Sequence, residues 1–269
     1  MAVCDPDEGM HSLFRGMLAE HDIVDLPRTD AAMAELDAFL ETRGPQLAGM
    51  LVEPLVQGAG GMLLHDPEVL RRLRTLADRH GLLLIFDEIF TGFGRTGTMF
   101  AFEQAGIKPD IITLSKALTG GTLPLAATVA SQRVFDGFWS DDPSHALMHG
   151  PTFMGNALAC AAANASLDLF ETEPRLAQAQ AISAALATGL APCRELDWVR
   201  DVRVLGAIGV VELDGIQDRE ALKRRLVEAG VWVRPFGNVV YLTPALTIDG
   251  QDLDTLMRAV VAVLRARRP

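Results

Sequence analysis

The sequence predicts an α/β fold in which a mostly parallel sheet is followed by a smaller α+β domain. Two apolar runs, at 82–86 and 110–115, are continuous, which is typical of parallel strands that helices cover on both faces. A helical pattern at 67–80 joins a strand at 47–52 to the run at 82–86 through short links, as in a βαβ unit. The expected domains are a large one, 1–192, and a small one, 193–269.

Proline and helix caps mark where the elements begin and end. Pro54 disfavours helix for the residue before it, so the apolar run ahead of it reads as a strand that stops there. Asp66 can cap a helix that begins at Pro67, and Gly81 can end that helix in the left-handed conformation. The expected helices are 30–43, 67–80, 155–170, 176–190, 219–229 and 252–265. The expected strands are 47–52, 82–86, 110–115, 125–130, 198–205, 207–213, 231–234 and 239–242, with a flexible connection at 57–61.

Two of these expectations concern packing. The strands at 82–86, 110–115 and 125–130 are expected to run parallel, because their apolar residues do not alternate. The helix at 155–170 is rich in alanine, so we expect it to be closely packed.

Composition restricts the classes of function. Of the 269 residues, 49% are hydrophobic and 22% are charged, which is enough apolar material for a substantial core. The net charge of −11 argues against nucleic acid as a partner, because a phosphate backbone favours a basic surface. No apolar run reaches the roughly 18 residues of a membrane span, so no membrane partner is expected.

The cysteines and the first residues favour a cytoplasmic protein. Cys4, Cys160 and Cys193 form neither a disulfide framework nor a zinc site, and no metal is expected. The first six residues lack the basic and apolar regions of a signal peptide. Residues 5–11 read as a loop and not as the start of an element.

A glycine motif at 92–97 matches G-x-G-x-x-G, which alone would suggest a dinucleotide site. That fingerprint should follow its strand directly, but residues 87–91 intervene here. The residues after the motif are not a convincing helix start. We therefore interpret the motif as a loop shaped by glycine.

Asp87 and Lys116 each end an apolar strand. Taken singly, the first could be a turn acid and the second a surface lysine. However, a helix start favours anions, so a lysine at that position needs another reason. Strand ends of α/β sheets are also where ligands bind. Pyridoxal phosphate (PLP) supplies the reason, because a lysine amine forms a Schiff base with the PLP aldehyde and a carboxylate favours the protonated form of the PLP ring nitrogen. The two residues are 116 − 87 = 29 positions apart.

At these residues the chain resembles the class III aminotransferases of fold type I. The resemblance covers nearly the whole chain and predicts a PLP-binding large domain with a small C-terminal domain. Several segments resemble the branch that aminates 8-amino-7-oxononanoate with S-adenosylmethionine in biotin synthesis. The segments that carry the resemblance are 87–89, 91–97, 116–121, 149–156, 160–167, 205–212 and 230–237.

The resemblance implies roles toward the cofactor. Lys116 would be the Schiff-base lysine and the proton carrier, and Asp87 would pair with the ring nitrogen. Ile89 would pack on one face of the ring. Thr152, with Pro151, would reach the cofactor phosphate of a neighbouring subunit, which implies a homodimer with shared active sites.

The resemblance also implies substrate contacts. Gly150 would lie beside the substrate, and Arg234 would hold the carboxylate of the oxononanoate in bidentate geometry. Tyr241 would line the same site. Glu53, which ends its own strand, would be a gating acid. The implied small-molecule partners are S-adenosylmethionine and 8-amino-7-oxononanoate.

Two departures from the family pattern leave alternatives open. Phe90 stands beside Asp87 where relatives often carry a smaller or polar residue, which could alter the amine pocket. No Ser-Gly-Ser-like phosphate loop precedes Glu53, and the single tyrosine is Tyr241, so we expect the N-terminal part of the large domain to be missing. The alternatives are a class III enzyme with an ω-amine or amino-acid donor, and a catalytically silent fragment.

Overall fold

The computed structural model describes residues 3, 14, 16–17, 19 and 21–266. The chain separates into two units, 1–47 and 48–269, each of which is described by itself. In the first unit, helix α1 covers Asp30–Arg43, as predicted, and the Thr29 hydroxyl caps it by accepting from the amide of Ala32 at 3.2 Å. A short 3-10 helix, η2 (Gly44–Gln46), follows. The expected loop at 5–11 and Cys4 lie outside the described residues.

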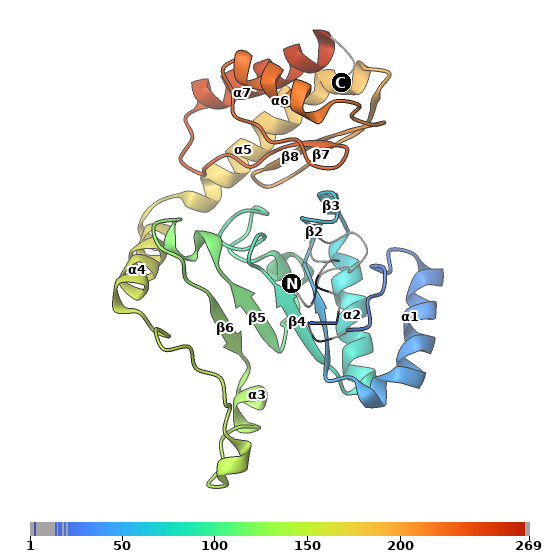
Figure 1. Ribbon diagram of the computed structural model, residues 1–269, viewed down its shortest axis with the longest axis vertical. Helices are drawn as coiled ribbons and strands as arrows, with labels where there is room; N and C mark the ends of the chain where they lie inside the picture. Colours follow the sequence, from blue (N-terminus) through green and yellow to red (C-terminus); the bar gives the residue numbers. More distant parts are fainter. Residues whose placement is uncertain (1–2, 4–13, 15, 18, 20, 267–269) are drawn as a thin grey trace. The chain divides into compact units, whose positions relative to one another are not determined.

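The second unit is built on a four-stranded sheet with the order β1-β4-β5-β6 (Figure 1). Strands β1, β4 and β5 are parallel neighbours, which confirms the predicted βαβ arrangement. Their bounds are Gly49–Val52 for β1, Leu83–Asp87 for β4, Ile111–Leu114 for β5 and Ala127–Ala130 for β6.

Strand β6 pairs with β5 in the antiparallel direction, so the prediction of a third parallel strand is wrong. A parallel return needs a crossover of about a dozen or more residues, usually with a helix. The segment between the two strands contains only the 3-10 helix η4 (Lys116–Thr119) and turns. The chain therefore folds straight back beside β5.

Helix α2 (Pro67–His80) connects β1 to β4 and has the predicted ends. The carboxylate of Asp66 accepts from the amide of Glu68 at 2.7 Å, and Gly81 has the left-handed φ of +68°. Its stripe of buried residues includes Leu70, Leu73 and Ala77. Local capping signals thus define this helix completely.

The glycine-rich connection predicted at 57–61 is part of a β-hairpin instead. Strand β2 (Val56–Gln57) pairs antiparallel with β3 (Leu63–Leu64). Leu55, just before β2, and Met62, just before β3, have left-handed φ values of +66° and +53°. Such values are costly for residues with a side chain, so surrounding contacts must hold this hairpin in place.

The second half of this unit folds around a three-stranded antiparallel sheet, β7-β8-β9. Helices α5 and α7 supply Ile182, Leu186, Val260 and Leu264 to the core beside it. The domain boundary at residue 193 stays a prediction, since α5 precedes it and packs with this sheet. The elements are α5 (Arg175–Gly189), η6 (Ala191–Glu195), β7 (Val199–Leu205), β8 (Ile208–Leu213), α6 (Arg219–Glu228), β9 (Val239–Leu242) and α7 (Gly250–Ala266).

The strand predicted at 231–234 does not form. Val231 and Val233 are buried and Trp232 and Arg234 exposed, so the segment has strand-like alternation but no ladder partner. Pro235 has no amide hydrogen to continue a ladder. Only an isolated bridge between residues 236 and 239 follows.

Helix α4 (Ala157–Thr172) begins at the cap residue Asn156, near the predicted start. The prediction that it is closely packed is wrong for this chain, because only Ala159 and Ala163 are buried and Leu158 is 74% exposed. Short helices α3 (Gln132–Asp136) and η5 (Pro143–His145) precede it, and η3 (Ala101–Ala105) lies between β4 and β5. Within the part of the chain that the structure describes, no helix has both the length and the apolar character needed to cross a membrane.

Candidate active site

Three ionisable residues follow three neighbouring strands at one edge of the parallel sheet. Glu53 comes directly after β1, Asp87 ends β4, and Lys116 lies just beyond β5. The register pairs Asp87 with Thr113 of β5, so the three strands end at a common level. The charge of Glu53 interacts with those of both Asp87 and Lys116, which shows that the three groups converge.

Glu53 is the half-buried member of this group. Its Oε1 accepts a hydrogen bond from the amide of Gly58 at 3.2 Å. Burial raises the pKa of Glu53 and the charge of Asp87 adds to the rise, whereas the Gly58 amide and Lys116 oppose it. A Cβ on Gly58 would lie 3.3 Å from Oε1 of Glu53 and 3.4 Å from Cδ1 of Phe90, so carboxylate and ring border the same small space.

Lys116 is exposed and has the strained φ of +46°. Residues in this conformation persist where their surroundings fix them, and they gather at functional sites. The hydroxyl of Ser115 donates to the carbonyl of Leu125 at 2.7 Å and ties the turn down. The Lys116 ammonium lies over the ring of Phe90, 5.1 Å from its centre.

Asp87 has one carboxylate oxygen in use. Oδ1 accepts from the amide of Ile89 at 3.0 Å, and no donor to Oδ2 occurs among the residues that the structure describes. Its register partner Thr113 has a buried hydroxyl that also lacks a partner there. Asp87 can therefore accept a further N–H donor without losing a bond it already has.

Glu88 is a buried residue next to the site, and the sequence assigned it no role. Its carboxylate is fully buried and accepts from the Thr91 hydroxyl at 2.6 Å and from the amides of Ala101 and Phe102 at 3.0 Å each. Burial raises the pKa of Glu88, and these three bonds act against the rise. The signal in the sequence was the acidic pair itself, because successive residues of an extended chain point to opposite faces.

The glycine motif at 92–97 forms turns and not the start of a helix, as predicted. Arg95 within it donates through Nη1 to the carbonyls of Ala207 at 3.2 Å and Pro244 at 2.7 Å. In return, the amide of Ala207 donates to the carbonyl of Arg95 at 2.9 Å. Burial lowers the pKa of Arg95. The turn therefore joins the loop after Asp87 to the region around the three-stranded sheet.

The remaining predicted residues lie elsewhere, and no contact among the described residues joins them to Asp87 or Lys116. Gly150, Pro151 and Thr152 are in an exposed loop, Arg234 is exposed, and Tyr241 is half-buried on β9 opposite Val210. Their roles at this site stay predictions.

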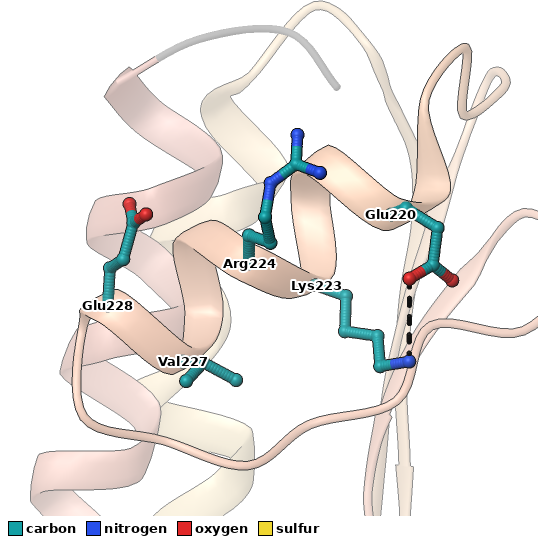
Figure 2. Close-up of a pocket in the computed structure, with 5 residues that line it drawn as sticks. All are labelled: Glu220, Lys223, Arg224, Val227 and Glu228. Carbon is teal, nitrogen blue, oxygen red and sulfur yellow. Dashed lines mark ion pairs between the residues drawn. The ribbon is translucent and has the colours of Figure 1, made fainter.

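A shallow surface pocket of about 220 Å³ lies on helix α6 (Figure 2). It is a groove between solvated side chains of one helix, in which Lys223 pairs with Glu220 at 3.5 Å, and we assign it no role. The residues that line it are Glu220, Lys223, Arg224, Val227 and Glu228.

Known proteins share this sequence and fold. Two curated proteins named adenosylmethionine-8-amino-7-oxononanoate aminotransferase are 40% identical over 272 residues (Corynebacterium glutamicum) and 44% identical over 266 residues (Mycobacterium leprae). They match 99% and 98% of this chain, which spans 64% and 61% of their lengths. The crystal structure of the Methanocaldococcus jannaschii protein of that name has a TM-score of 0.87 at 30% identity, over 96% of this chain and 63% of that one.

An amine transaminase from an uncultivated Pseudomonas species, solved with PLP bound, has a TM-score of 0.82 at 34% identity over 94% of this chain and 63% of its own. These similarities confirm the α/β, fold-type I architecture predicted from the sequence. The family model for class III aminotransferases matches residues 1–264. The chain therefore belongs to the class III aminotransferase family.

Proposed function

We propose that the protein is a PLP-dependent aminotransferase that transfers an amino group from S-adenosylmethionine to 8-amino-7-oxononanoate, giving 7,8-diaminononanoate for biotin synthesis. The observation that carries the proposal is the convergence of Asp87, Lys116 and Glu53 at adjacent strand ends. The names of the curated relatives, at 40% and 44% identity, support the substrates.

The residues at these strand ends fit PLP. Oδ2 of Asp87 can accept a hydrogen bond from a pyridinium nitrogen, and the negative charge of Asp87 favours the protonated ring. The Lys116 amine is exposed and can reach an aldehyde. Ile89, whose amide donates a hydrogen bond to Asp87, can pack on a ring face. When bound, PLP supplies an electron sink for the negative charge that develops on the substrate carbon.

Lys116 has a second role in the proposed reaction as the group that moves a proton at the reacting carbon. A flexible amine next to a carboxylate can alternate between proton donor and acceptor. The charge of Glu53 interacts with that of Lys116, and the ring of Phe90 lies beneath this amine. In this proposal half-buried Glu53 is the gating acid beside Lys116.

The substrate contacts and the assembly belong to the same proposal. Arg234 would bind the carboxylate of the oxononanoate, and Gly150 and Tyr241 would line its site. Pro151 and Thr152 would contact the phosphate of a cofactor in a second subunit, which their exposed loop leaves accessible. We therefore propose a cytoplasmic homodimer with shared active sites.

Borohydride reduction in the presence of PLP tests this function. The sequence contains three lysines, Lys108, Lys116 and Lys223, so the phosphopyridoxyl label can be assigned by peptide mapping. We expect the label on Lys116, its loss in Lys116→Arg and its retention in Lys108→Arg. A label shared evenly among the lysines, or absent from Lys116, would exclude the proposal.

An ω-amine donor is the second candidate, favoured by the similarity to the amine transaminase structure. Phe90 borders the space beside Lys116 and could select such a donor. A donor panel separates the candidates: turnover with simple amines but not with S-adenosylmethionine would replace the first proposal by the second.

A further inference from the structure

Arg203 lies on β7 of the three-stranded sheet, and its side chain contacts the β2–β3 hairpin. Its Nε donates to the carbonyl of Met62 and its Nη2 to that of Gly61, both at 2.9 Å. Its Nη1 pairs with Glu212 at 2.6 Å and with Asp201 at 3.0 Å. The Arg203 side chain is only 12% exposed. Its guanidinium forms ion pairs with two carboxylates on one side and donates hydrogen bonds to two backbone carbonyls on the other.

The two carbonyls belong to a strained turn, residues 58–62, which we call the hairpin turn. The amides of Gly61 and Met62 donate to the carbonyl of Gly58, at 3.3 and 3.0 Å. Met62 has a φ of +53°, a left-handed conformation that is strained for a residue with a side chain. Arg203 binds the carbonyl that follows this strained φ, and charge-assisted hydrogen bonds are stronger than neutral ones.

The other end of the hairpin turn meets the candidate active site. The Gly58 amide donates to Oε1 of Glu53, the group whose charge interacts with Asp87 and Lys116. A continuous set of hydrogen bonds therefore runs from Arg203 through the turn to Glu53.

We propose that Arg203 is a positioning residue for Glu53: it fixes the hairpin turn so that the Gly58 amide holds the Glu53 carboxylate beside Lys116. The consequence at Lys116 rests on the proposed function. The anchoring of the turn is a property of the protein alone. Sequence reasoning gave Arg203 no role, since its backbone partners lie 141 and 142 residues away.

Hydrogen–deuterium exchange of the amides at 58–62 tests the anchoring without the cofactor. Arg203→Met removes both donors to the turn, and we expect about tenfold faster exchange there, as the loss of bonds to a charged group implies. Arg203→Lys keeps the charge for Glu212 but cannot span both carbonyls, so it should also accelerate exchange while the domain stays folded.

Arg200→Met is the matched control. Arg200 lies on the same strand and approaches Glu212 at 3.6 Å, but its side chain is 62% exposed and, among the described residues, makes no hydrogen bond or ion pair with the turn. It should leave exchange at 58–62 unchanged. The proposal is overturned if the turn exchanges at the wild-type rate in both Arg203 variants, or if Arg200→Met accelerates it equally.

A spectroscopic arm tests whether Arg203 acts through Glu53. The groups that face Glu53 are the Asp87 carboxylate, the Lys116 amine and the ring of His65, whose Nε2 lies 3.2 Å from the Glu53 carbonyl. Glu53→Gln removes the negative charge beside Lys116, and Arg203→Met should move that charge away by releasing the turn. Each variant should therefore lower the pH midpoint of the visible absorbance change of protein-bound PLP.

In the double variant the midpoint should equal that of Glu53→Gln alone. An additional shift from Arg203→Met in the Glu53→Gln background would overturn the action through Glu53. If wild-type protein does not bind PLP on Lys116, the proposed function fails, whereas the exchange comparison still decides whether Arg203 anchors the turn.

Discussion

The ammonium nitrogen of Lys116 lies 5.1 Å from the centre of the Phe90 ring. Phe90 follows β4 and Lys116 follows β5, so the contact joins the segments beyond two neighbouring strands. A cation over an aromatic face is attracted to it, and this attraction holds a flexible lysine in one direction. We therefore expect Phe90 to position the lysine side chain.

A double-mutant cycle with Phe90→Leu and Lys116→Met measures this contact. We expect a coupling energy of about 0.5–1 kcal/mol in urea unfolding, the size of an exposed cation–π pair. Phe90→Tyr keeps a ring under the ammonium and should retain the coupling. Additivity of the two single effects within about 0.3 kcal/mol would show that the ring does not hold the lysine.

Gly206→Ala should separate the glycine turn from the three-stranded sheet. A Cβ at Gly206 would lie 2.4 Å from the carbonyl carbon of Thr96 and 2.5 Å from the carbonyl oxygen of Arg95, and its φ is +54°. Backbone cannot yield as a side chain can, so we expect a loss of roughly 2–5 kcal/mol in the free energy of unfolding.

Gly215→Ala is the control for that substitution, because nothing lies within 4 Å of its added Cβ. It should change the free energy of unfolding by less than about 0.5 kcal/mol. Equal effects of the two substitutions in urea unfolding would contradict the tight contact at Gly206.

Cys193 should be inert to alkylation in the folded protein. Its side chain is fully buried, and burial raises the pKa of the thiol to about 11. At pH 8 roughly one molecule in a thousand would carry the reactive thiolate. Mass spectrometry after iodoacetamide treatment should find Cys193 labelled only in urea, whereas partly buried Cys160 reacts earlier. Rapid labelling of Cys193 under native conditions would show that this core opens readily.

The elements that the sequence predicted are those with local signals. The α2 helix follows from Asp66 and Gly81, which lie at its own ends. The direction of β6 and the β2–β3 hairpin depend on how a chain segment returns to its neighbours, and the residues there carry no local mark of it. The prediction of a strand at 231–234 was wrong, because alternating buried and exposed residues do not show whether a partner strand is present.

The residues at and around the candidate active site also fall into two groups, those that the sequence identifies and those that it does not. Glu53, Asp87 and Lys116 could be found because each stands where a strand ends, a position that the sequence reveals. Glu88 and Arg203 were given no role, because several of their partners are backbone groups far along the chain. A backbone partner carries no residue type that the sequence could reveal.

Glu88→Gln should change how stability depends on pH. Because burial raises the pKa of Glu88, the folded protein keeps this proton to a higher pH than the unfolded chain, whose glutamates titrate near about 4.3. The folded state binds more protons in that window, so the wild-type free energy of unfolding falls as pH rises from about 4.3 through the raised pKa. Glutamine cannot ionise, so the wild type should lose stability relative to Glu88→Gln over this window in thermal unfolding.

Thr91→Val tests the sign of this effect at the same carboxylate. The Thr91 hydroxyl donates to Glu88 at 2.6 Å and acts to lower its pKa, so its removal should raise that pKa further. The relative loss of stability with increasing pH should then be larger than in the wild type and extend to a higher pH. Parallel pH curves for the wild type, Glu88→Gln and Thr91→Val would mean that Glu88 binds its proton equally in the folded and unfolded states, contrary to the effect of its burial.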